Sequence, residues 1–556
     1  MPPKEVNYTF DDKELEQLKA FGEVRSHQAG DILSEEGEAC VDCLITLSGE
    51  SHIFVGQAAD KKRVGFMERG QFAGDLTVLT GQASLSRVIM GEDGDILHIA
   101  HSQFKRLLVE NSHLSDVFVR VLTARREFGR QSQNGGIIVI GENQDRHDLS
   151  IRQLLDRHGI PHTALSARTD PLAQQMMSVR GLEKSDLPAV LRGTLDPLVK
   201  PSIEELSAAF GLDLLPDEAT ADVAVIGAGP AGLAASVYAA SEGLDVVTLD
   251  AEAPGGQAGT SSKIENYLGF PSGVSGRELA ERASIQAQKF GVRLASPVSV
   301  KALSRDDDAY CLTLGDDRHL RARAIVVATG AQYRRLPIED LERFEGRGIH
   351  YGATPMEAQL CGQQSVAVIG AGNSAGQGAV FLSETAKEVH IVYRRADIRE
   401  TMSEYLVRRL EELPNVHFHP STELKALHGV DGADEEDDHL TAVTWENSED
   451  GSEERCDTSF IFMFVGAVPC TDWLPDTMSC DENGFLKTGD DLKDEDLEKA
   501  NWPLERAPTR YETSWPRIYA VGDVRTRSVK RVASAVGEGS VVVSDIHAAL
   551  SETNQL

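Results

Sequence analysis

Residues 221–232 read A-D-V-A-V-I-G-A-G-P-A-G, an apolar run that leads into three spaced glycines. An apolar run followed by G-x-G-x-x-G predicts a β-strand, a tight turn and a helix. Gly227 permits the turn, Gly229 lets the backbone approach a pyrophosphate, and Gly232 allows close packing of the helix. Asp250 ends the next apolar run, where a carboxylate can accept hydrogen bonds from ribose hydroxyls. The stretch therefore predicts an α/β, Rossmann-like dinucleotide-binding domain.

A second copy of the pattern lies farther along the chain. Residues 365–375 read S-V-A-V-I-G-A-G-N-S-A and place Gly370, Gly372 and Ala375 at the three fingerprint positions. Gly227 and Gly370 are about 140 residues apart, a spacing that predicts two dinucleotide-binding domains.

Three arginines follow the strand predicted after the second fingerprint. The apolar run 389–392 leads to Arg394, Arg395 and Arg399. A domain that binds NAD carries an acid near this place, whereas guanidiniums pair with a 2′-phosphate. The pattern predicts NADPH as the electron donor.

The composition limits the class of protein. The 556 residues include 88 Asp and Glu against 55 Lys and Arg, a formal net charge of −33. This charge repels nucleic acids and anionic lipid surfaces, so we expect neither as a partner. Seven cysteines are too few for a disulfide scaffold, and the sequence shows no secretory leader and no apolar run of about 18 residues. We expect a cytoplasmic protein of roughly three or four folding units, without a metal site.

The N-terminal part of the chain precedes the first fingerprint. Residues 1–130 alternate short β-like runs with glycine turns and end in a helical stretch over 102–128, which predicts a small β-barrel with helices. Residues 134–212 begin with a strand-like run at 137–140 and continue with a helical stretch at 149–158. We predict a second, smaller α/β domain there.

Further motifs make residues 221–556 resemble the low-molecular-weight thioredoxin reductases, flavoproteins in which an NADPH domain is inserted into an FAD domain. The motifs are G-G-Q at 255–257, I-E-N-Y at 264–267, A-T-G at 328–330 and Y-A-V-G-D at 519–523. The resemblance implies FAD and NADPH as cofactors and a homodimer. It divides this part of the chain into an FAD domain at 219–334 and 466–556 and an NADPH domain at 335–465.

The fingerprints and the resemblance together give two sets of candidate cofactor-binding residues. By resemblance, Asp523 hydrogen-bonds the ribityl chain, Asn266 faces the isoalloxazine, and Lys530 lies near the pyrimidine edge of the flavin. The FAD set is Gly227, Gly229, Pro230, Ala231, Gly232, Asp250, Gly256, Gln257, Asn266, Thr329, Gly330, Gly522, Asp523, Lys530, Arg531 and Val532. The NADPH set is Gly370, Gly372, Asn373, Ser374, Ala375, Arg394, Arg395 and Arg399.

One motif of the resembled family is missing. Thioredoxin reductases carry a Cys-x-x-Cys just before the second fingerprint, and this chain has Gly352 and Pro355 at those positions. Two cysteines are needed there, because their disulfide accepts two electrons from the reduced flavin and the resulting dithiol passes them onward. The Cys-x-x-Cys that the chain does have, Cys40 to Cys43, enters a β-like run whose alternate residues face opposite sides. We therefore expect no catalytic side chain beside the flavin itself and no disulfide reduction by the usual route.

These observations predict an NADPH-dependent FAD oxidoreductase of the thioredoxin reductase-like superfamily. Its electron acceptor stays open between a carrier protein, a quinone and dioxygen. The alternative is a non-catalytic redox or nucleotide sensor, in which the flavoprotein part acts through the N-terminal domains.

Residues 1–130 resemble cyclic-nucleotide-binding domains through the run F-A-G-D-L at 72–76. Asp75 is one carbon shorter than the glutamate of that family, and Ser84 stands where its phosphate-binding arginine belongs. Without that arginine a cyclic phosphate loses a strong charge-assisted pair of hydrogen bonds. We do not expect cyclic nucleotide binding and favour a docking or dimerisation role.

Residues 134–212 faintly resemble thioredoxin and glutaredoxin. The loop at 142–147, where those families carry redox cysteines, reads E-N-Q-D-R-H. The run D-L-P-A-V at 186–190 is similar to their cis-proline loop, so we expect a cis bond before Pro188. A domain of this kind without cysteines cannot exchange disulfides.

Overall fold

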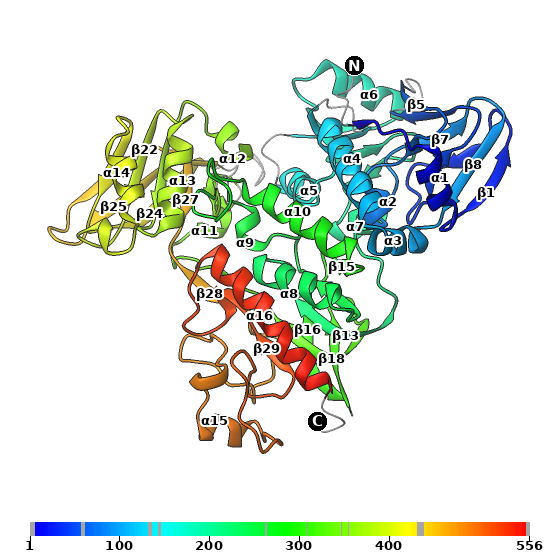
Figure 1. Ribbon diagram of the computed structural model, residues 1–556. Helices are drawn as coiled ribbons and strands as arrows, with labels where there is room; N and C mark the ends of the chain where they lie inside the picture. The colour runs from blue at the N-terminus through cyan, green and yellow to red at the C-terminus, as the bar shows by residue number, and fades with distance from the viewer. Residues whose placement is uncertain are drawn as a thin grey trace.

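The computed structural model describes residues 6–56, 62–131, 136–142, 146–261, 264–306, 308–345, 347–353, 355–430 and 439–551. Figure 1 shows three lobes, with the N-terminal strands in blue on the right and the yellow-green sheet of residues near 350–460 on the left. The central lobe holds the first fingerprint and the red C-terminal helix. None of the helices in these ranges is both long and apolar enough to cross a bilayer.

The N-terminal lobe contains two antiparallel four-stranded sheets, in the orders β1-β8-β3-β6 and β2-β7-β4-β5. The strands are β1 (Glu23–His27), β2 (Ile32–Ser34), β3 (Cys43–Thr46), β4 (Ser51–Val55), β5 (Lys62–Met67), β6 (Phe72–Ala73), β7 (Arg87–Met90) and β8 (Gly94–Ile99). The helices are α1 (Asp12–Lys19), α2 (Thr77–Thr80), α3 (His101–Glu110) and α4 (Ser112–Gln131).

Two expectations for this lobe need correction. In the described residues the strands do not close into a barrel, because the edge strands β2 and β6 are only three and two residues long and offer few backbone groups for pairing across the gap. The helical stretch expected over 102–128 is two helices. Asn111 separates them, and its side chain accepts a hydrogen bond from the Leu114 amide at 3.0 Å, so it caps α4.

The next unit is a four-stranded sheet in the order β10-β9-β11-β12, in which β10 is parallel to β9 and β11 is antiparallel to both β9 and β12. Its strands are β9 (Ile137–Gly141), β10 (His162–Ser166), β11 (Ala189–Arg192) and β12 (Leu198–Val199), and its helices are α5 (Arg146–Arg157), α6 (Pro171–Arg180) and α7 (Ile203–Phe210). The Leu187–Pro188 bond is cis, as expected. Residues 143–145 of the cysteine-free loop lie outside the described ranges.

The central lobe is built on a seven-stranded sheet in the order β15-β14-β13-β18-β17-β16, with β29 paired to β18. Its strands are β13 (Glu218–Ile226), β14 (Val246–Leu249), β15 (Arg293–Ala295), β16 (Val300–Asp306), β17 (Ala309–Leu314), β18 (His319–Val327) and β29 (Ile518–Ala520). The helices are α8 (Pro230–Ser241), α9 (Gly256–Gly259), α10 (Gly276–Lys289), α15 (Asp494–Lys499) and α16 (Val532–Ser551). Separate apolar clusters cover the two faces of the sheet, which is why β13 reads as a continuous apolar run.

The left lobe holds a five-stranded parallel sheet in the order β20-β27-β21-β22-β23 and a three-stranded antiparallel sheet, β24-β25-β26. The strands are β20 (Ile349–His350), β21 (Ser365–Ile369), β22 (Glu388–Val392), β23 (Val416–His419), β24 (Thr422–Val430), β25 (His439–Asn447), β26 (Glu453–Cys456) and β27 (Phe460–Met463). The helices are α11 (Leu341–Phe344), α12 (Pro355–Leu360), α13 (Asn373–Ser383) and α14 (Glu404–Glu411). The two chain crossings to the central lobe pair with each other as β19 (Ala331–Tyr333) and β28 (Ala467–Pro469).

The N-terminal lobe packs on the central lobe through α10. Ile285 of α10 is 6% exposed and belongs to an apolar cluster whose other buried members, Phe104 and Phe118 among them, come from the N-terminal lobe. Arg130 of α4 and Glu281 of α10 form an ion pair of 2.8 Å beside it. The two lobes therefore share a hydrophobic core.

Candidate cofactor-binding site

The first fingerprint forms a turn between β13 and α8. Gly227 has φ +105°, a left-handed conformation that favours glycine, and a Cβ there would also clash with the Ala328 carbonyl oxygen. A Cβ on Gly232 would collide with the Gly227 carbonyl oxygen. Gly229 precedes the first residue of α8, so the N-terminal amides of this helix open toward the turn. The turn has the bare backbone and helix dipole that hold a pyrophosphate.

Asp250 lies directly after β14 and against this turn. Its Oδ2 accepts a hydrogen bond from the Ala228 amide at 2.7 Å. Its Oδ1 accepts from the amides of Glu252 and Ala253 at 3.0 and 2.9 Å. Burial raises the pKa of the carboxyl group, while these hydrogen bonds oppose the rise. The predicted ribose-binding acid is thus held at the fingerprint by three amides.

The G-G-Q segment meets the same turn from the other side. The Gly255 amide donates to the Ala228 carbonyl at 2.7 Å, and a Cβ on Gly256 would lie 3.1 Å from the Gly229 Cα. The Gln257 side-chain amide donates to the Ala331 carbonyl, where the chain leaves toward the left lobe. These predicted residues are therefore gathered around one backbone cradle.

The predicted flavin residues near the C-terminus also reach the cradle. A Cβ on Gly522 would lie 2.9 Å from the Cβ of Ala231 in the first turn of α8, beside Pro230. Burial raises the pKa of Asp523, and the Lys530 ammonium opposes this rise. Lys530 Nζ donates to the Asp523 carbonyl oxygen and to Ser528 Oγ, the latter at 3.1 Å.

The remaining residues of the FAD set lie in three places: before and at the start of α16, after β18, and after the Ile264–Val274 pairing. Arg531 is exposed and Val532 is the first residue of α16. Thr329 Oγ1 donates to the Cys470 carbonyl at 2.9 Å, and Gly330 has φ +64°. Asn266 is exposed, in the segment that follows the pairing of Ile264 with Val274.

The second fingerprint repeats the geometry in the left lobe. Gly370 has φ +139°, and a Cβ there would clash with the Phe464 carbonyl oxygen. Gly372 caps α13, which begins at Asn373. Ser374 is exposed in the first turn, and Ala375 is fully buried where the helix packs on its sheet. The second turn thus has the same bare backbone and helix N-terminus as the first, which suits the predicted dinucleotide site.

The three arginines of the NADPH set differ in the carboxylates that lie beside them. Arg399 lies 2.5 Å from Glu411 and near two further carboxylates, those of Asp397 and Glu404. Arg395 pairs with Glu400 at 2.6 Å. Arg394 is exposed, and no described carboxylate lies within ion-pair distance of its guanidinium.

The acids beside Arg399 and Arg395 could not be expected from the run of arginines alone. Asp397 and Glu400 are neighbours in the sequence, but Glu404 and Glu411 come close only because α14 folds back on the strand end. The three guanidiniums, which look alike in the sequence, therefore differ in how much of their charge is neutralised by neighbouring carboxylates.

Gly352, at the first position of the missing Cys-x-x-Cys, lies against the central lobe. A Cβ on Gly352 would lie 3.5 Å from Thr260 Oγ1, and Pro355 begins α12. All seven cysteines of the chain are free thiols. Cys361 is fully buried, and burial raises its pKa to about 11. Neither Gly352 nor Pro355 supplies a thiol.

In the F-A-G-D-L run at 72–76 of the N-terminal lobe, the polar side chain of Asp75 bonds other residues of the same lobe. Asp75 Oδ2 accepts a hydrogen bond from Arg126 Nε at 3.1 Å, and its Oδ1 accepts from Thr77. Ser84 bonds the Ser86 carbonyl at 2.9 Å, and Arg87 is paired with Glu35. These contacts were not apparent from the sequence, because Arg126 lies 51 residues from its partner.

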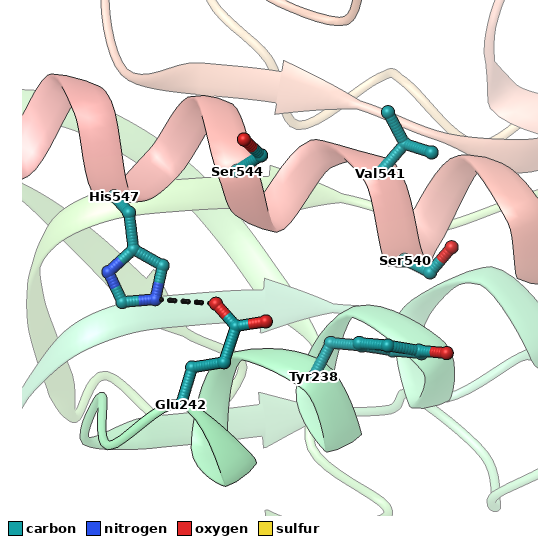
Figure 2. A pocket seen from close by; sticks show the side chains of 6 residues that line it. All are labelled: Tyr238, Glu242, Ser540, Val541, Ser544 and His547. Atoms are coloured by element: carbon teal, nitrogen blue, oxygen red, sulfur yellow. Dashed lines mark ion pairs between the residues drawn. The ribbon is translucent and has the colours of Figure 1, made fainter.

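The two helices that flank the first cradle also form a surface hollow. Figure 2 shows its lining: Tyr238 of α8 and Glu242, which follows this helix, with Ser540, Val541, Ser544 and His547 of α16. His547 and Glu242 form an ion pair of 3.0 Å across it. The hollow lies along the later turns of α8 and contains none of the predicted cofactor-binding residues.

Comparison with known proteins places this geometry in a family. Residues 221–539, more than half of the chain, match the family described as pyridine nucleotide-disulphide oxidoreductase. The chain belongs to that family. Residues 24–111 match the cyclic nucleotide-binding domain. The chain is therefore a flavoprotein similar to the thioredoxin reductases. FAD and NADP are the cofactors of its family.

Individual relatives agree with this membership. The chain is 30% identical to the thioredoxin reductase of Mycoplasmopsis pulmonis over 58% of its own length and 94% of the relative's. It is 29% identical to the thioredoxin reductase of Bacillus subtilis, over 61% and 98% of the two chains. The crystal structure of T. acidophilum thioredoxin reductase matches with 26% identity and a TM-score of 0.52, over 59% of this oxidoreductase and 98% of that chain.

Proposed function

We propose that this flavoprotein passes electrons from NADPH through FAD to its acceptor without the redox disulfide that thioredoxin reductases use. The observation that carries the proposal is the pair Gly352 and Pro355, which stand where thioredoxin reductases have their two cysteines. The buried Cys361, with its raised pKa, is no substitute for a thiolate nucleophile. The acceptor is a carrier protein, a quinone or dioxygen.

FAD supplies the hydride-accepting ring when bound, and the residues of the chain bind and orient it. The turn at Gly227 and the amides of α8 stabilise the pyrophosphate, and Asp250 accepts from the ribose. Asp523 accepts from the ribityl chain, and the Lys530 ammonium offers positive charge at the pyrimidine edge.

The left lobe serves the donor. The turn at Gly370 and the first amides of α13 bind the pyrophosphate of NADPH, and Arg394 and Arg395 bind its 2′-phosphate. The β19–β28 crossing joins the two cradles, so that the nicotinamide can be brought against the flavin.

The experiment uses the purified holoprotein under anaerobic conditions. We expect NADPH to bleach the flavin in stopped flow and added thioredoxin to cause no extra NADPH consumption. A double variant, Gly352→Cys with Pro355→Cys, is the matched control, because Gly352 faces Thr260 with room for a side chain. Steady thioredoxin-dependent turnover by the wild-type protein would refute the proposal.

The alternative is a sensor without turnover, and the shared core at Ile285 favours it in one respect. Ile285 of the central lobe packs among buried residues of the N-terminal lobe, so the two lobes are in the direct contact that a sensor needs. Reoxidation separates the two functions, because an enzyme must return quickly to the oxidised flavin with some acceptor. A sensor stays reduced after one turnover.

The organisation of the chain is part of the proposal. We propose the boundaries 1–130, 134–212, 219–334, 335–465 and 466–556, a cytoplasmic homodimer, and a thioredoxin-like second domain. The order β10-β9-β11-β12, with one parallel and two antiparallel pairings, supports the last point. The Arg126–Asp75 pair supports an N-terminal domain that does not bind cyclic nucleotides.

A further inference from the structure

The C-terminal end of α5, in the second unit, reaches the first cofactor cradle. Arg157 Nη1 lies 2.5 Å from Glu252 Oε2, and its Nη2 donates to the Ala253 carbonyl at 3.4 Å. The amides of these same two residues hold the Asp250 carboxylate. Arg157 therefore contacts the loop at residues 252–253, whose amides bond the predicted ribose-binding acid, Asp250.

His158, the residue directly after α5, holds a second loop beside Asp250. His158 Nδ1 lies 2.8 Å from the Leu154 carbonyl, which can only accept, so this nitrogen carries the proton. Its Nε2 then accepts from Ser296 Oγ at 2.9 Å. Burial lowers the pKa of His158 to about 4, which keeps the ring neutral and this tautomer in place.

Ser296 lies in the loop that leaves β15. In that loop the Val298 amide donates to the Asp250 carbonyl at 2.7 Å, and the Ala295 carbonyl accepts from the Asp250 amide at 3.1 Å. Arg157, the last residue of α5, and His158, which follows it, thus contact the two loops that flank Asp250. Both loops therefore lie beside the carboxylate that is expected to meet the ribose of a dinucleotide.

The end of α5 is itself held from the N-terminal lobe. Arg126, 3% exposed, donates from Nη1 to the Gly159 carbonyl at 3.0 Å and from Nε to Asp75 at 3.1 Å. The segment 157–159 is therefore fixed on one side by the N-terminal lobe and contacts the central lobe on the other.

We propose that Arg157 and His158 are positioning residues for the adenosine diphosphate half of FAD, so that docking of the second unit and binding of FAD favour each other. The inference rests on the proposed function of the Gly227 cradle as the FAD site. Arg157 acts through the loop at Glu252 and Ala253, and His158 acts through Ser296.

The test measures binding to apoprotein prepared from the full chain, with FAD and, separately, ADP as probes. We expect Arg157→Ala to raise both dissociation constants about two- to fivefold, because the ion pair is partly exposed and such pairs contribute about 1 kcal/mol or less. Glu252→Gln removes the same pair from the exposed side of the interface and should have a similar effect. The double variant Arg157→Glu with Glu252→Arg should recover most of the loss.

Arg130→Ala is the matched control, because Arg130 also joins the N-terminal half to the central lobe but pairs with Glu281 of α10. It should change either dissociation constant less than twofold, even where it lowers the melting temperature of the apoprotein as much as Arg157→Ala does. Unchanged FAD and ADP binding in Arg157→Ala and Glu252→Gln overturns the coupling alone. Wild-type protein that binds no FAD overturns the proposed function itself.

Discussion

Replacing Arg394 by Ala should weaken the use of NADPH far more than the use of NADH. Arg394 is the guanidinium of the three that no described carboxylate neutralises, whereas Arg399 is shared by Glu411, Glu404 and Asp397. Two unit charges 4 Å apart, such as a guanidinium and a phosphate oxygen, attract each other by about 1 kcal/mol in bulk water and about 4 kcal/mol near a protein surface. At about 1.4 kcal/mol per decade, we expect the NADPH half-saturation to rise roughly ten- to a hundredfold.

The matched control is Arg399→Ala, which should raise the NADPH half-saturation less than about threefold, because its charge is already compensated. The assay is anaerobic flavin reduction at two salt concentrations with NADPH and with NADH. The Arg394→Ala effect should shrink at the higher salt, since exposed charges are screened. Equal losses for both nucleotides, or a larger loss in Arg399→Ala than in Arg394→Ala, would refute the assignment of Arg394 to the 2′-phosphate.

Three other outcomes are expected. Asp523→Ala should lower the retention of FAD during purification, because a ribityl hydroxyl loses its charged acceptor, and the ratio of absorbance at 450 and 280 nm measures this. Gly352→Cys alone should give no thioredoxin-dependent NADPH oxidation, since a single thiol cannot cycle through an internal disulfide. His158 has a folded pKa of about 4 against 6.5 unfolded, so its contribution is present above pH 6.5 and lost as the pH falls toward 4, by up to about 3 kcal/mol. Urea unfolding at pH 7.5 and 4.5 should therefore show a smaller pH dependence for His158→Gln than for the wild-type protein.

The parts of the molecule that follow from short-range geometry could be predicted from the sequence. Gly227, Gly232 and Gly370 are required by the left-handed backbone or by the close approach of another segment, and each of these constraints acts within a strand–turn–helix unit. The same holds for Asp250, which ends the neighbouring strand.

Contacts between distant segments could not be predicted in this way. The Arg157–Glu252 pair spans 95 residues and the Arg126–Asp75 pair spans 51, and neither leaves a periodic pattern in the sequence. The expected barrel was wrong because the edge strands β2 and β6 are only three and two residues long, and the ends of strands are among the features hardest to predict from sequence.

The apolar cluster around Ile285 limits where this protein can be cut. Ile285 is 6% exposed only because α2 and α3 of the N-terminal lobe cover α10. A fragment that starts near residue 214 would contain every predicted cofactor-binding residue, yet it would present this isoleucine to water and lose Arg157 and His158 as well. A shortened chain would therefore expose apolar surface that the full chain covers. A polar residue in place of Ile285 would remove this exposed apolar side chain.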